Sequence, residues 1–93
     1  MSEPPEDYVL RLAPGCRLNA PGGQEDLLLL PEGALRLKGP ARAILELCDG
    51  ERASRQIVEE LTRLYPTDDP GRIETEVMAL LSRLRDRGVL ESV

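Results

Sequence analysis

The segment from residue 69 to residue 88 constrains the fold most, because its apolar residues recur at the spacing of an α-helix. Five of them fall at offsets of four, seven, eight and eleven residues and share one helix face: Ile73, Val77, Leu80, Leu81 and Leu84. Asp69 and Pro70 form a start signal, an N-cap followed by a proline in the first turn. Gly88 marks the end. The pattern predicts a long amphipathic helix whose apolar face needs a partner.

Two shorter helices are predicted before this one. The segment 41–48 carries apolar residues at helical spacing, and Asp49-Gly50 is expected to end that helix. The segment 54–65 has a second apolar face, with Ser54 as the expected N-cap and Pro66 just after its end. The second half of the chain is therefore predicted to form a three-helix bundle.

The first half of the chain reads as short strands separated by turns. The turn Pro31-Glu32-Gly33 is expected to join residues 27–30 to residues 34–38 in a hairpin, since proline fixes φ and glycine can adopt a left-handed conformation. Apolar and charged residues alternate along 34–38, which is typical of a half-buried strand. Residues 16–19 supply a third strand, and Val89-Leu90 can return as a short one.

These elements predict an α+β fold that is winged helix-turn-helix-like. An N-terminal three-stranded antiparallel sheet is followed by the three-helix bundle, so the order is sheet first and helices second. A chain of 93 residues has room for one core, and we expect a single domain at residues 9–93 behind a disordered tail at residues 1–8. The tail is acidic and rich in proline rather than basic and apolar, so we expect a cytoplasmic protein. No apolar run approaches the roughly 18 residues of a membrane span.

The residue types argue against catalysis and against nucleic acid as a partner. The chain has no histidine, and Cys16 and Cys48 sit in no metal-ligand spacing, so neither an enzyme active site nor a bound cofactor is expected. Seventeen acidic residues against twelve basic ones give a net charge of −5, which repels phosphate backbones. The first turns of the long helix carry Glu74 and Glu76, where a DNA-reading helix would be basic.

The predicted surfaces favour the capture of an extended peptide. A three-stranded sheet has an open edge that can accept a further strand. If the long helix lies beside that edge, the two form a trough with an aliphatic floor and a cationic rim, from Arg36, Lys38, Arg83 and Arg87. A homodimer formed through the apolar stripe of the long helix is the alternative reading.

Several motifs resemble the PqqD family of pyrroloquinoline quinone (PQQ) biosynthesis. They are the turn Leu30-Pro31-Glu32-Gly33, the segment Ile44-Leu45-Glu46-Leu47-Cys48-Asp49-Gly50, and the late Arg87-Gly88-Val89-Leu90. The resemblance runs from about residue 9 to the end of the chain. It implies a winged-helix-like peptide chaperone, also called a RiPP recognition element. Such a protein binds the precursor peptide PqqA and presents it to the radical S-adenosylmethionine enzyme PqqE, whose iron–sulfur clusters belong to that enzyme.

The resemblance also implies where the peptide binds. In related domains the leader peptide adds as a strand beside the third strand and lies against the third helix. Carried over by position, the peptide-binding residues are Ala34, Leu35, Arg36, Leu37, Lys38, Ile73, Val77, Leu80, Leu81 and Leu84. Similar domains serve other peptide-modifying systems, such as lasso-peptide pathways, so a leader peptide of another pathway remains an alternative cargo.

Overall fold

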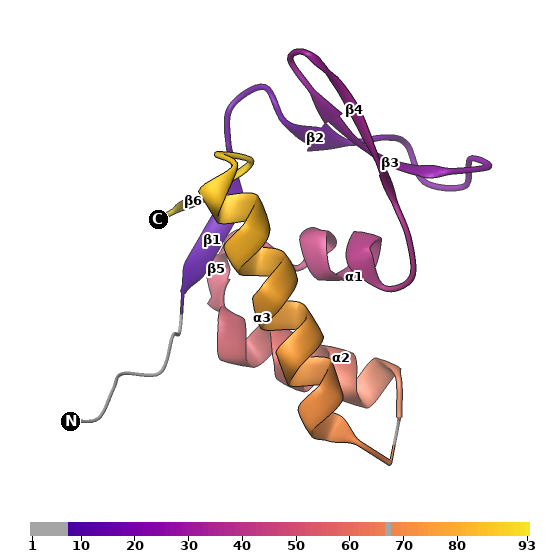
Figure 1. Cartoon of the computed structure of the whole chain (residues 1–93), viewed down its shortest axis with the longest axis vertical. Coiled ribbons are helices and arrows are strands. Elements are labelled where there is room, and N and C mark those ends of the chain that lie inside the picture. The colour runs from indigo at the N-terminus through magenta and orange to yellow at the C-terminus, as the bar shows by residue number, and fades with distance from the viewer. Residues whose placement is uncertain (1–7, 67) are drawn as a thin grey trace.

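Two three-stranded antiparallel sheets and three helices make up residues 8–66 and 68–93, the part of the chain that the computed structural model describes (Figure 1). One sheet has the strand order β2-β3-β4 and the other the order β5-β1-β6. The elements follow one another as β1 Val9–Leu12, β2 Arg17–Leu18, β3 Asp26–Leu30, β4 Gly33–Leu37, α1 Ala41–Glu46, β5 Asp49–Ala53, α2 Ser54–Leu64, α3 Pro70–Asp86 and β6 Leu90–Ser92.

The sheet predicted for the first half of the chain is confirmed. β3 and β4 form the hairpin, with Leu28 opposite Leu35 and Leu30 opposite Gly33. The left-handed conformation expected for Gly33 was wrong: Gly33 is the first residue of β4 and has no positive φ, so Pro31 and Glu32 alone form the turn. β2 pairs with the other side of β3. The four-leucine run is a strand, with Leu28 fully buried in the core and Leu30 packed against it.

The second sheet was not predicted, and it corrects the expected order of sheet first and helices second. β5 lies between α1 and α2, and β6 follows α3, yet both pair with β1 (Figure 1). Asp49-Gly50 was wrongly expected to end the first helix: α1 ends at Glu46, and Asp49 begins β5. The Asp49 carboxylate accepts the backbone N–H groups of Glu51 and Arg52, which lower its pKa and fix the entry into this strand.

The boundaries of α3 follow the predicted start and stop signals, whereas the start of α2 does not. α3 begins at Pro70 behind Asp69, whose carboxylate accepts the backbone N–H of Arg72, and Gly88 follows its end with φ of 80°. Ser54 was wrongly predicted as the N-cap of α2. Ala53 holds that position, and its N–H donates to Gln56 Oε1 at 2.8 Å. The Ser54 hydroxyl instead accepts the backbone N–H of Tyr8 at 3.0 Å, which ties the start of β1 to α2.

The core lies where the two sheets meet the helices. Twelve buried apolar residues form it: Leu10, Leu28, Ile44, Leu45, Cys48, Ile57, Leu61, Val77, Leu81, Leu84, Val89 and Leu90. Both sheets and all three helices contribute, so the burial that stabilises the helices also holds the sheets against them. No helix within residues 8–66 and 68–93 is long and apolar enough to cross a membrane.

The predicted tail at residues 1–8 falls almost entirely outside the described residues, which begin at Tyr8. The backbone of Tyr8 exchanges two hydrogen bonds with Ser54, and its ring lies beneath the Arg85 guanidinium at 4.0 Å. Tyr8 is therefore part of the folded domain.

Cys48 should make the protein less stable at alkaline pH. Burial, and then the charge of Asp49, raise the pKa of its thiol from 9.0 to about 12. Above pH 9 the unfolded chain loses this proton and the folded chain keeps it, so the contribution to stability is lost as the pH rises toward 12. Between pH 8 and pH 10 the loss is about 1.4 kcal/mol.

This loss can be separated from other titrations by comparing the wild-type protein with Cys48→Ala in urea unfolding at pH 8 and pH 10. The stability advantage of the wild type over Cys48→Ala should shrink by about 1.4 kcal/mol over that range. A constant difference would show that the thiol ionises equally in both states.

Candidate peptide-binding site

The outer edge of β4 is open, because β4 is an edge strand with β3 as its neighbour. The Leu27 carbonyl accepts the Asn19 N–H at 3.0 Å, so the backbone of Leu27 faces β2. Backbone groups alternate sides along an antiparallel strand, so Leu28 faces β4 and bonds its opposite residue, Leu35. The next residues on β4, Ala34 and Arg36, therefore direct their N–H and C=O groups away from β3. These groups can pair with an added strand.

The side chains of β4 alternate as the sequence predicts. Leu35 and Leu37 are half-buried and pack against the core, whereas Ala34, Arg36 and Lys38 are exposed. Arg36 forms a loose ion pair with Glu25 at 3.5 Å. An added strand would therefore find a continuous backbone edge with cationic side chains beside it.

A pocket of about 400 Å³ opens where β4 leads into α1. Residues of the β4–α1 connection, α1, the end of α2 and the first half of α3 line it: Gly39, Pro40, Ile44, Leu61, Tyr65, Pro66, Asp69, Arg72, Ile73, Glu76 and Val77. Figure 1 shows the chain after β4 descending toward the junction of α2 and α3. The connection that follows β4 thus meets the N-terminal half of α3 at this pocket.

The five predicted residues of α3 divide into two groups. Val77, Leu81 and Leu84 are 1%, 0% and 4% exposed and belong to the core. Ile73 and Leu80 are half-buried, and Ile73 lines the pocket. The structure therefore brings Ile73 and Val77 together with Gly39 and Pro40, which follow β4, and it places Leu81 and Leu84 in the interior. The role of all five in peptide binding stays a prediction.

One flank of α3 continues from the pocket toward the end of the helix. Glu76, Leu80, Arg83 and Arg87 follow each other at spacings of four, three and four residues, which keeps them on one side. At the pocket end Glu76 is paired with Arg72 at 3.1 Å. Arg83 and Arg87 are exposed at the other end. The flank is thus charge-balanced beside the pocket and cationic beyond it.

Several pocket residues were not identified as site residues from the sequence. Tyr65 was interpreted as part of the apolar face of the second helix, Pro66 and Asp69 as helix boundaries, and Gly39-Pro40 as the end of a strand. The β4–α1 connection and the α2–α3 connection, which hold these residues, converge and line the pocket. The turn residues before α1 and between α2 and α3 were the sequence signal that could have indicated this pocket. Within residues 8–66 and 68–93 no group of three or more candidate metal ligands gathers.

Comparison with known proteins places this geometry in a family. The family model described as coenzyme PQQ synthesis protein D (PqqD) matches residues 25–90, a span that includes β3, β4, all three helices and the pocket. The chain is 35% identical over 88 residues to the PqqA binding protein of Methylococcus capsulatus, covering 94% of this chain and 91% of that protein.

Two solved structures share the fold. The PqqD truncation of Methylobacterium extorquens PqqCD is a stand-alone RiPP recognition element. It is 36% identical, with a TM-score of 0.72 over 89% of this chain and 88% of that one. The heterocyclase TruD is 29% identical with a TM-score of 0.63, and the match covers 92% of this chain and 12% of TruD. By sequence and by structure, this chain belongs to the PqqD family of RiPP recognition elements.

Proposed function

We propose that this protein captures the precursor peptide PqqA by adding it as a strand along the outer edge of β4. The observation that carries the proposal is the open β4 edge, with a largely apolar pocket beside α3 that begins at Gly39 and Pro40, just after this strand. The edge offers backbone hydrogen bonds to a peptide of any sequence, and the pocket selects peptides that carry an apolar side chain at the matching position. The similar protein of Methylococcus capsulatus is named a PqqA binding protein, which supports this choice of cargo.

The proposed site assigns different tasks to the ten predicted residues. Ala34, Arg36 and Lys38 lie along the bound peptide, with Ala34 and Arg36 providing the ladder. Ile73 and Leu80 contact apolar side chains of the peptide. The remaining residues support this surface from the core side: Leu35, Leu37, Val77, Leu81 and Leu84.

A site of this kind gives moderate affinity. Four ladder hydrogen bonds contribute about 2–6 kcal/mol, and two buried apolar side chains add about 1.5–3 kcal/mol each. Association costs on the order of 4–15 kcal/mol, which leaves micromolar binding. That affinity suits a protein that releases its cargo.

The proposal includes a non-catalytic role. The protein holds PqqA and presents it to PqqE in the cytoplasm, and the chemistry and its cofactors belong to that enzyme. Strand addition supports this role because an extended peptide bound along one edge keeps its remaining residues free for a second protein.

Calorimetric titration with a synthetic PqqA peptide tests the function. We expect one-to-one binding in the micromolar range, and we expect added PqqE to form a ternary complex on size-exclusion chromatography. The likeness to TruD motivates a parallel titration with leader peptides of other RiPP pathways. Tighter binding of such a leader would overturn the assignment to PqqA. Absence of binding to any of these peptides would overturn peptide capture itself.

A further inference from the structure

We propose that Arg42 is a positioning residue for peptide capture, which fixes the β2–β3–β4 sheet, and with it the open edge of β4, relative to α1 and the pocket. This inference rests on the proposed function. Arg42 lies in the first turn of α1 and does not line the pocket. Its effect on the peptide would therefore act through the sheet.

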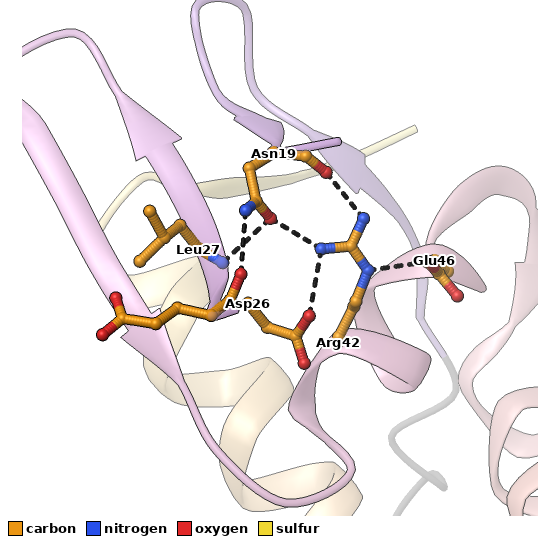
Figure 2. A network of polar contacts seen from close by, with 6 residues as sticks. Asn19, Asp26, Leu27, Arg42 and Glu46 are labelled. Carbon is orange, nitrogen blue, oxygen red and sulfur yellow. Dashed lines mark hydrogen bonds and ion pairs between the residues drawn. The ribbon is translucent and has the colours of Figure 1, made fainter. Parts of the chain in front are cut away.

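All three nitrogens of the Arg42 guanidinium are engaged, and two of them join α1 to the sheet (Figure 2). Nη2 donates to the Asn19 backbone carbonyl at 2.6 Å, and Nη1 donates to Asn19 Oδ1 at 2.6 Å. Nη1 also lies 3.4 Å from Asp26 Oδ1, at the start of β3. Nε donates to Glu46 Oε2 at 3.0 Å, within α1 itself. One side chain thus contacts the residue after β2, the first residue of β3 and the last residue of α1.

Asn19 extends the reach of this network along the sheet. Its Oδ1 accepts the Leu27 backbone N–H at 3.0 Å, and its Nδ2 donates to the Glu25 carbonyl at 2.9 Å (Figure 2). The Asn19 side chain therefore links the two ends of the loop between β2 and β3. Asp26 and Leu27 belong to β3, and β3 pairs with β4. The position of Arg42 therefore helps to set the position of the open edge of β4.

The burial of Arg42 separates it from the other ion-paired arginines. Its side chain is 14% exposed, whereas those of Arg63 and Arg72 are 73% and 75% exposed. The guanidinium presents its N–H donors in a rigid plane, so when it is shielded from water it holds its partners in a defined geometry. A solvent-exposed ion pair fixes its partners only weakly. Arg42 therefore has the geometry of a fixed joint rather than of a surface charge.

This link between the sheet and α1 matters because the proposed peptide site includes both the sheet and the helices. The open edge belongs to β4, whereas the pocket is built mostly from the helices. Leu28 packs the sheet onto the core, with Leu30 and Leu35 beside it, but apolar contact is not directional and fixes the orientation of the sheet less sharply than hydrogen bonds do. The directional bonds of Arg42 restrict that movement. A misplacement of about 1 Å is enough to weaken a preorganised site.

Arg42→Met tests the inference, because methionine keeps much of the apolar stem and removes all the donors. The matched control is Arg63→Met, which removes an exposed ion pair from α2. We expect Arg42→Met to weaken binding of the PqqA peptide by about 10-fold and Arg63→Met by less than about 2-fold. Arg42→Lys keeps the charge but not the fork, so its affinity should lie between those of the wild type and Arg42→Met.

Residual dipolar couplings of the free proteins give a readout that a loss of stability alone would not move. In Arg42→Met the β2–β3–β4 sheet should be reoriented or less ordered relative to α3, with the β5–β1–β6 sheet unchanged. Asn19→Ala, which keeps the carbonyl acceptor and removes the amide, replaces Arg42→Met if that variant does not fold, and should reduce affinity by about 3-fold.

The outcomes separate this inference from the proposed function. If the wild type binds PqqA and folded Arg42→Met binds it equally well with unchanged couplings, Arg42 has no positioning role and peptide capture stands. If the wild type does not bind, the proposed function fails and this inference fails with it.

Discussion

Replacing Arg36 with proline is expected to weaken PqqA binding by about 10- to 100-fold. The Arg36 N–H points away from β3, so proline removes a donor that only an added strand would use. Its ring also occupies the position of the incoming backbone, which adds a steric cost to the lost hydrogen bond. The β3–β4 hairpin should survive, because edge strands tolerate proline where the N–H faces outward. Calorimetry on the folded variant measures the effect.

Arg36→Ala is the matched control, since it removes the same side chain and its ion pair with Glu25 but keeps the backbone N–H. We expect this variant to bind within about 3-fold of the wild type, because an exposed ion pair contributes little. Equal losses in the two variants would mean that the side chain, and not strand addition, accounts for binding at this position.

Replacing Ile73 with aspartate is expected to reduce affinity by about 30- to 100-fold. Ile73 lies on the α3 wall of the pocket and packs against the core. A carboxylate there would have to lose water when an apolar peptide side chain enters, which opposes binding. Peptide titrations monitored by fluorescence anisotropy give the dissociation constants.

Thr75→Asp adds the same charge to the same helix two residues away, on the exposed side of α3. Its affinity should remain within about 2-fold of the wild type. If both aspartate variants lose affinity equally, net charge rather than the pocket controls binding. If neither loses affinity, the peptide does not use the pocket.

Local signals predicted the elements whose boundaries depend on neighbouring residues. The Asp69-Pro70 start and the Gly88 stop of α3 were predicted because capping requires only local backbone geometry. The β3–β4 hairpin was predicted because Pro31 interrupts two apolar runs, although the expected left-handed Gly33 was wrong: Gly33 lies in β4 and pairs with Leu30. The second sheet was missed because β5 pairs with β1 across some forty residues of chain. Such pairing leaves no periodic signal in strands that are short and partly exposed.

Only the two elements of the candidate site, the edge of β4 and the apolar face of α3, could be predicted from the sequence. Apolar spacing identified the face of α3, but it could not separate Ile73 and Leu80 from the buried Val77, Leu81 and Leu84. That division depends on how the helix is rotated against its neighbours. Arg42 carried no sequence signal at all, since a charged residue early in a helix is usually solvated. Its burial arises from the loop of Asn19 folding over α1.

Intermolecular NOEs between the isotope-labelled protein and an unlabelled PqqA peptide test strand addition to β4 most directly. If the peptide adds to β4, NOEs are expected from the backbone amides of Ala34 and Arg36 to an extended peptide, and from the Ile73 methyl groups to an apolar peptide side chain. NOEs confined to β2, or to the β5–β1–β6 sheet, with those three residues unaffected, would contradict strand addition to β4.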